Sequence, residues 1–306
     1  RLMPPLVAAC AQQANGAVVL GRLVELVRAI ARRSVYLALL ADHGAALNRL
    51  VDLCGASPWI AQQITRSPIL LDELLDGRVL ATPPPRAALT RMLDDAIDTA
   101  DPGDLDRVMD VLRNFKHQQL LRVAACDLMT NFPIAEVSNH LTWIAEVIVT
   151  KALALAWRDL VAKHGRPRRS GQSRGVGFGV IAYGKLGGLE LGYGSDLDLV
   201  FVHDRSGPND ITDGAKSIPN EVFFTRLAQR LIHFIATRTP AGQAYELDIR
   251  LRPSGASGLL VTSLDAFQDY QRHSAWTWEH QALQRARGIA GTPETLEHFA
   301  AILRDV

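Results

Sequence analysis

The sequence predicts an α+β fold with a long helical N-terminal region, a small mixed sheet and the start of a C-terminal helical bundle. Two observations predict it. Apolar residues recur at spacings of three and four through most of the first 164 residues, which is the period of an amphipathic helix. After residue 175, short apolar runs and one strictly alternating segment stand between glycine-rich turns, which is typical of strands.

The helical region carries start and stop signals as well as periodicity. Ser57 before Pro58 is typical of a helix start, with the serine as N-cap and the proline in the first turn, and Ser67 before Pro68 repeats the signal. We therefore predict helices over residues 18–41, 45–54, from 57, from 67 and over 104–164, with breaks at 82–85, 101–103 and 131–133.

The second half alternates strand and helix signals. Residues 165–175 form a basic, irregular stretch that we interpret as an exposed loop or, as the alternative, a polyanion-binding loop. Strands are predicted at 176–183, 196–202 and 245–252. In the segment 245–252, apolar and polar residues alternate strictly. Helices are predicted at 220–237 and 264–287, followed by a further helical element from 288 to 306.

Length and composition limit the possible classes of protein. A chain of 306 residues predicts about two domains, and we place the boundaries at 1–105, 106–275 and 276–306. Apolar residues make up 48% and the net charge is +1, so a dedicated nucleic-acid binder is not expected. The longest apolar stretch, Leu141–Trp157, is interrupted by Glu146 and Lys151, so a membrane span is not expected either. Three scattered cysteines favour reduced thiols in a cytoplasmic protein. The chain lacks an initiator methionine and stops within a pattern, so we expect a piece of a longer polypeptide.

Two carboxylates lie side by side in the second predicted strand. Asp196 and Asp198 are two residues apart, so on a strand they face the same side and repel one another. Mg²⁺ prefers such oxygen ligands, and Asp248 on another predicted strand would complete a three-carboxylate site if the strands pair. The alternative is a pair of solvated acids at a strand edge. The apolar flanks weigh against it, because burying unpartnered carboxylates is costly.

A glycine-rich turn precedes the two acids. Gly187 and Gly188 would let backbone N–H groups approach a phosphate, and Lys185 would add a positive charge. A turn of this kind is more often only a tight connection. Its position a few residues before Asp196 favours the phosphate-binding interpretation.

These motifs resemble a known family. Gly187-Gly188 followed by Asp196-x-Asp198 is similar to the nucleotidyltransferase signature of the DNA polymerase β superfamily. The longer strings resemble the glutamine synthetase adenylyltransferases, in GKLGGLEL (184–191), SDLDL (195–199), DIRLRPSG (248–255), AIARRS (29–34) and ASPWIA (56–61). The resemblance covers most of the chain and implies a polymerase β-like nucleotidyltransferase domain.

The family is bifunctional, with one unit that adds AMP to glutamine synthetase and one that removes it by phosphorolysis. Residues 275–283 (AWTWEHQAL) are similar to the adenylylating, C-terminal unit. The resemblance thus implies transfer of AMP from ATP to a tyrosine of glutamine synthetase, with release of pyrophosphate, in the regulation of nitrogen assimilation. It also implies Mg²⁺ as cofactor and the PII signal protein as a second partner.

The same resemblance assigns roles to individual residues. Asp196 and Asp198 would bind Mg²⁺, and Asp248 would be a third ligand or the base for the tyrosine hydroxyl. Triphosphate contacts would come from Gly187, Gly188, Lys185 and Ser195, although Ser195 is as well suited to capping a turn. Arg250 and Arg252 would neutralise phosphate charge, or else pair with the acids.

Other functions remain open at this point. The adenylyl-removing unit has the same fold, and a nucleotidyltransferase acting on RNA or a small molecule would share the acids, although RNA binding lacks a basic face. A non-catalytic nucleotide sensor is a further alternative. Trp276 and Trp278 lie two apart and cannot share a helix face, so we expect one of them in the core, with base stacking as the less favoured use.

Overall fold

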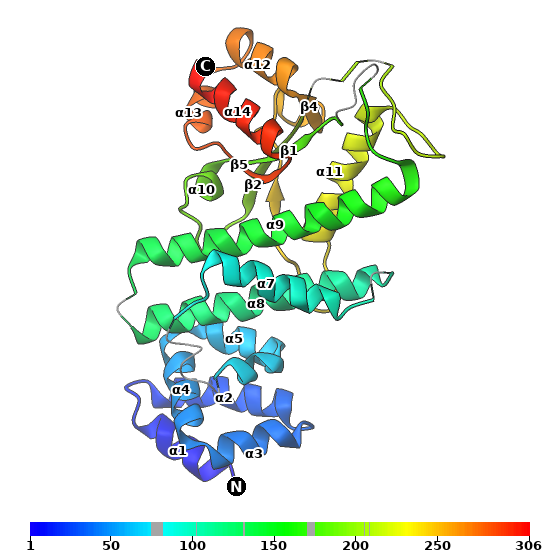
Figure 1. Ribbon diagram of the computed structural model, residues 1–306. Coiled ribbons are helices and arrows are strands. Elements are labelled where there is room, and N and C mark those ends of the chain that lie inside the picture. Colours follow the sequence, from blue (N-terminus) through cyan, green and yellow to red (C-terminus); the bar gives the residue numbers. More distant parts are fainter. Residues whose placement is uncertain (75–81, 102, 131, 170–174, 205, 208) are drawn as a thin grey trace. The chain divides into compact units, whose positions relative to one another are not determined.

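The computed structural model describes residues 1–74, 82–101, 103–130, 132–169, 175–204, 206–207 and 209–306 (Figure 1). The remaining positions include parts of the predicted breaks near 102 and 131 and of the loop at 165–175, and these lie outside the described residues. The chain divides into two compact units, residues 1–85 with 114–140 and residues 86–113 with 141–306. The boundaries expected at 105 and 275 do not coincide with this division.

The first unit is helical. Ser57 caps a helix as predicted, because its Oγ accepts the N–H of Ile60 at 3.3 Å. The helix predicted over 18–41 is two helices, separated at residues 31–33. The elements of this unit are α1 (Met3–Ala11), α2 (Gly16–Ile30), α3 (Ser34–Asp42), α4 (Gly44–Ala56), α5 (Pro58–Arg66) and the 3₁₀ helix η1 (Pro68–Leu74).

Two long helices have residues in both units, α8 (Leu105–Met129) and α9 (Ile134–His164). They confirm the helical prediction for 104–164. The other helices of the second unit are α7 (Arg86–Asp98), the single turn α10 (Gly184–Gly187), α11 (Asn220–Ala236), α12 (Leu264–His273), α13 (Thr277–Leu283) and α14 (Pro293–Asp305). No helix among the described residues is long and apolar enough to cross a membrane.

The second unit contains a mixed sheet of five strands, which confirms the predicted fold class. Strand β1 pairs antiparallel with both β2 and β5. Strand β2 pairs in parallel with β3 at its beginning and with β4 at its end. The strands are β1 (Phe178–Ala182), β2 (Leu197–His203), β3 (Leu247–Asp248), β4 (Val261–Ser263) and β5 (Arg287–Gly291).

Both faces of the central strands are buried. On one face Phe178 stacks against Phe201 and against Phe224 of α11. On the other face Ile181 and Val200 belong to a cluster with residues of α12, α13 and α14, which cover this face in Figure 1. This double burial explains why 176–183 reads as a continuous apolar run.

Three expectations from the sequence are wrong in this unit. The strand predicted over 245–252 spans only two residues, because the chain enters turns after Asp248. Further along these turns, Ser254 and Gly255 have positive φ values of 61° and 57°. The helices predicted over 264–287 and from 288 are α12, α13, strand β5 and α14. Neither tryptophan is in the core, since Trp276 is 70% and Trp278 is 55% exposed.

Candidate active site

Three aspartates lie near the point where β2 pairs with β3. The two strands run in parallel with Asp198 directly opposite Asp248, and Asp196 lies just before β2. Asp196 is exposed, whereas Asp198 and Asp248 are half-buried. The pairing of the two strands is the arrangement on which the three-carboxylate prediction depended.

The charges in this cluster are unevenly balanced. Burial raises the pKa of Asp198, and the neighbouring carboxylates of Asp196 and Asp248 raise it further, against the opposing effect of Arg250 and Lys185. The pKa of Asp248 is lowered, chiefly by the hydrogen bonds from Arg250. Negative charge is therefore in excess around Asp198, which favours the binding of a cation there.

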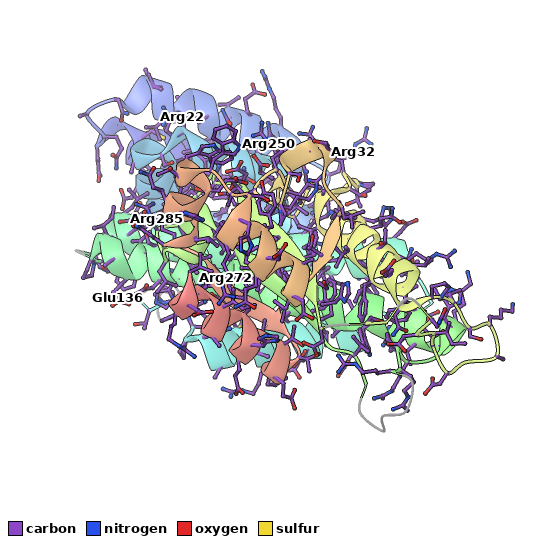
Figure 2. All side chains as sticks on the ribbon, turned by 90° about the horizontal axis from the view of Figure 1, so that it is seen from above. Arg22, Arg32, Glu136, Arg250, Arg272 and Arg285 are labelled. Carbon is purple, nitrogen blue, oxygen red and sulfur yellow. The ribbon has the colours of Figure 1, made fainter. Side chains whose placement is uncertain are left out.

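Arg250, which Figure 2 labels, belongs to the turn after β3. Its side chain pairs with Asp248. Its Nε donates to both carboxylate oxygens, at 3.0 and 2.9 Å, its Nη2 donates to Oδ2, and its backbone N–H donates to Oδ1 at 2.8 Å. The ion pair with an acid, one of the two interpretations of this arginine, is thus what the side chain makes here. Asp248 keeps few free lone pairs as long as this pair is closed.

The hydrogen bonds of Arg252 go to backbone carbonyl oxygens and not to the acids. Its guanidinium donates to the carbonyl oxygens of Ile249 at 2.6 Å, Ala256 at 3.0 Å and Gly258 at 3.3 Å. Arg252 is not on a strand, although the predicted strand over 245–252 included it, because β3 ends at Asp248. Arg252 holds the loop that joins β3 to β4.

The glycine-rich turn forms α10, beside the acids. The N–H groups of Gly187 and Gly188 donate to Tyr183 O at 2.9 Å and to Gly184 O at 3.1 Å, so both are used within the turn. Gly184 has φ +53°, and a Cβ there would stand 2.2 Å from Asp198 Oδ2. Lack of a side chain is therefore what lets α10 lie against Asp198.

Ser195 makes the turn-capping contact. Its Oγ accepts the N–H of Gly192 at 3.1 Å, which closes the turn that leads into Asp196. Lys185 is exposed on α10 and near enough to Asp198 to oppose the rise in its pKa. Among the described residues, no three or more acidic, histidine or cysteine side chains are grouped closely enough to hold a metal ion as they stand.

Sequence reasoning missed the segment that borders α10 on its other side. Arg285 and Arg287 contact α10 and the residues after it, yet they fell within a predicted helix. The run Gly288-Ile289-Ala290-Gly291 is short, apolar and bounded by glycines. This is the signal that identified 176–183 as a strand, and it marks β5 as well.

The fold is thus an α+β domain in which the parallel pairing of β2 and β3 places Asp198 opposite Asp248, next to the turn α10. Residues 47–302 match the family model described as glutamate-ammonia ligase adenylyltransferase. The chain belongs to this family.

Curated relatives agree with this assignment. The chain is 54% identical over its whole length to the bifunctional glutamine synthetase adenylyltransferase/adenylyl-removing enzyme of Thioalkalivibrio sulfidiphilus, covering 32% of that protein. It is 52% identical over 98% of its length to the protein of the same name from Pseudomonas putida, and 50% identical over 99% to that of Pseudomonas aeruginosa, covering 31% of each. The chain therefore spans about a third of the length of these relatives.

Proposed function

We propose that this chain is an adenylylating unit, which transfers AMP from ATP to a tyrosine hydroxyl of glutamine synthetase and releases pyrophosphate. The observation that carries the proposal is the pairing of Asp198 opposite Asp248 on parallel strands beside α10, with Asp196 just before β2 and near enough to act on the pKa of Asp198. The relatives' name, which contains this activity, supports it. A cytoplasmic location and contact with the PII signal protein are part of the same proposal.

The donor set fits Mg²⁺ better than any softer metal, because it consists of carboxylates alone. Asp196 and Asp198 are the primary ligands in this proposal. Burial is the main cause of the raised pKa of Asp198, and the carboxylates of Asp196 and Asp248 add to it, so a cation would stabilise the charged form. Asp248 joins them when Arg250 turns away from it. The ion would supply charge neutralisation for the triphosphate and lower the pKa of the attacking hydroxyl.

The remaining roles in the transfer step fall to side chains of this chain. The tyrosine oxygen attacks the α-phosphorus of ATP, the bond from that phosphorus to the bridging oxygen breaks, and pyrophosphate leaves. Asp248 accepts the hydroxyl proton, or acts as third metal ligand. Arg250, once released from Asp248, and Lys185 are the cations placed to balance the phosphate charge.

Among the residues expected to contact phosphate, three are engaged within the protein. The N–H groups of Gly187 and Gly188 and the hydroxyl of Ser195 already have partners. We therefore assign them the role of shaping the site next to Asp198. Ser195 can still donate its hydroxyl hydrogen to a phosphate oxygen while Oγ accepts from Gly192. A contact of Arg252 with the triphosphate requires its hydrogen bonds to the loop carbonyls to open.

A second candidate function differs from the first only in the direction of AMP transfer. The relatives' name also contains adenylyl removal, which in the family is phosphorolysis of AMP-tyrosine. The resemblance of residues 275–283 to the adenylylating unit favours addition. Nucleotidyl transfer to RNA is disfavoured by the net charge of +1.

The test uses ATP radiolabelled in its α-phosphate, Mg²⁺ and unmodified glutamine synthetase, with this chain and with a version extended past Val306. We expect label on a tyrosine, and release of pyrophosphate. Asp196→Asn and Asp198→Asn should each reduce transfer at least about a hundredfold, because an amide cannot supply the charge that holds the ion. Asp95→Asn, an exposed acid on α7, is the matched control.

Two results would decide against the proposal. Wild-type transfer by either aspartate variant would eliminate the metal site. Release of ADP from adenylylated glutamine synthetase and phosphate, without labelling of the unmodified protein, would identify the adenylyl-removing unit instead.

A further inference from the structure

The turn α10 is held from one side by the segment around β5. The carbonyl oxygen of Arg285 lies so close to Gly187 that a Cβ there would stand 1.8 Å from it. Arg285 also pairs with Glu190, which follows α10, with Nη1 and Oε2 2.8 Å apart. Two residues later, Arg287 donates through Nη2 to Leu186 O at 3.1 Å and through Nε to Gly187 O at 3.3 Å.

Arg287 is itself fixed by a buried carboxylate. Its Nη2 lies 2.5 Å from Oε1 of Glu146, a residue of α9 whose side chain is only 1% exposed. The other oxygen, Oε2, lies 2.9 Å from Nη2 of Arg86 at the start of α7. The buried carboxylate of Glu146 thus lies between the guanidiniums of Arg86 and Arg287, and the guanidinium of Arg287 also donates hydrogen bonds to α10.

The guanidinium of Arg287 is well suited to hold the end of α10 in place. A helix leaves its last carbonyl groups without partners, and a cation at that end is favourable. Arg287 donates to the last two carbonyls of α10 through Nε and Nη2, and the same Nη2 also lies against Glu146 Oε1. A lysine could keep the charge but not the fork of fixed donors, so arginine is the residue that this position requires.

We propose that Arg287, oriented by Glu146, is a positioning residue for the nucleotide site. It keeps α10, and so Lys185 and the Gly184 contact with Asp198, at a fixed distance from the acids. The inference rests on the proposed function, since it assigns ATP binding to the site formed by α10 and the acids. It adds a residue that touches neither the acids nor the glycine N–H groups.

The experiment compares wild type with Arg287→Gln and Arg287→Lys, and with Arg272→Gln as control. Arg272 makes an ion pair with Asp305 between α12 and α14, and both side chains are about half exposed. Three quantities are measured: hydrogen exchange of amides 184–190, the Kd for ATP with Mg²⁺, and kcat and KM of AMP transfer. The first two do not depend on AMP transfer being the activity.

In Arg287→Gln we expect exchange of amides 184–190 to accelerate about tenfold, while exchange in α2 stays at the wild-type rate. The Kd and KM for ATP should rise about tenfold, and kcat should fall by up to about a hundredfold, because small displacements of positioning groups are costly. Arg287→Lys should retain most of the thermal stability through Glu146 but little of the ATP affinity. Arg272→Gln should match wild type in all three.

Unchanged exchange and unchanged Kd in Arg287→Gln would overturn the proposal. So would equal acceleration in α2 and in 184–190, or full recovery of ATP affinity by Arg287→Lys, since either indicates a purely structural ion pair. A wild-type chain that binds ATP but transfers no AMP would refute the proposed function alone, and the exchange and Kd comparison would still decide the role of Arg287.

Discussion

Gly187 gives the sharpest test of how α10 is packed. A Cβ at this residue would stand 1.8 Å from Arg285 O and 2.7 Å from Ala182 O, both of them backbone atoms. Ordinary contact begins at 3.4 Å, so the closer atom would have to move by about 1.6 Å (3.4 minus 1.8). Neither carbonyl lies on a flexible side chain that could turn aside.

The cost of Gly187→Ala follows from that overlap. Inserting a methyl group into a packed site costs about 1–3 kcal/mol and more where the backbone must shift. Because β1 and the residues before β5 would both be displaced, we expect the upper end, about 3 kcal/mol. Movement of α10 by about 1 Å away from Asp198 should also reduce AMP transfer about a hundredfold.

Urea unfolding of Gly187→Ala measures the first effect, and AMP transfer by the fraction that remains folded measures the second. Two glycines with nothing within 4 Å of the added Cβ serve as controls. Gly21→Ala lies within α2 and should stabilise by about 0.5–1 kcal/mol, whereas Gly194→Ala should be neutral. If Gly187→Ala unfolds at the same urea concentration as wild type, the packing of α10 against residue 285 is wrong.

Three further predictions concern buried or paired charges. Without Mg²⁺, Asp198→Asn should be as stable as wild type or slightly more stable at neutral pH. Any gain in stability should fade in acid, because the wild-type carboxyl becomes protonated as pH falls through its raised pKa; thermal melts at a series of pH values measure this. Arg250→Gln should be less stable at neutral pH, and the loss should vanish as pH falls through the lowered pKa of Asp248, seen by acid denaturation. Arg113→Met should cost about 3 kcal/mol in urea unfolding, because this fully buried guanidinium donates to three carbonyl oxygens that would lose their partner.

The candidate site could be predicted from the sequence where its signal was local. The i, i+2 spacing of Asp196 and Asp198 predicts a shared face on a strand, and the apolar residues after them specify the buried strand β2, which begins at Leu197 and carries Asp198. Asp248 was predictable only as a candidate, since no local pattern states which strands pair. The parallel register of β2 and β3 brought it opposite Asp198.

The roles of the arginines were not predictable from spacing. Strict alternation over 245–252 favoured one long strand, but the chain turns after Asp248, so Arg250 folds back and Arg252 bonds the loop. The two tryptophans were misjudged for a related reason, because apolar character does not say which side of a short helix meets the core. Both are exposed on or beside α13.

The sequence by itself determined the helical first half, the α+β class and the two acids at the start of β2, because each depends on the period of neighbouring residues or on a short motif. Only the tertiary structure decided the pairing of Asp198 with Asp248, the strand β5 and the support of α10 by Arg287 and Glu146. These contacts join residues 50 to 141 positions apart, and their energy comes from burial and hydrogen bonds that no local pattern encodes.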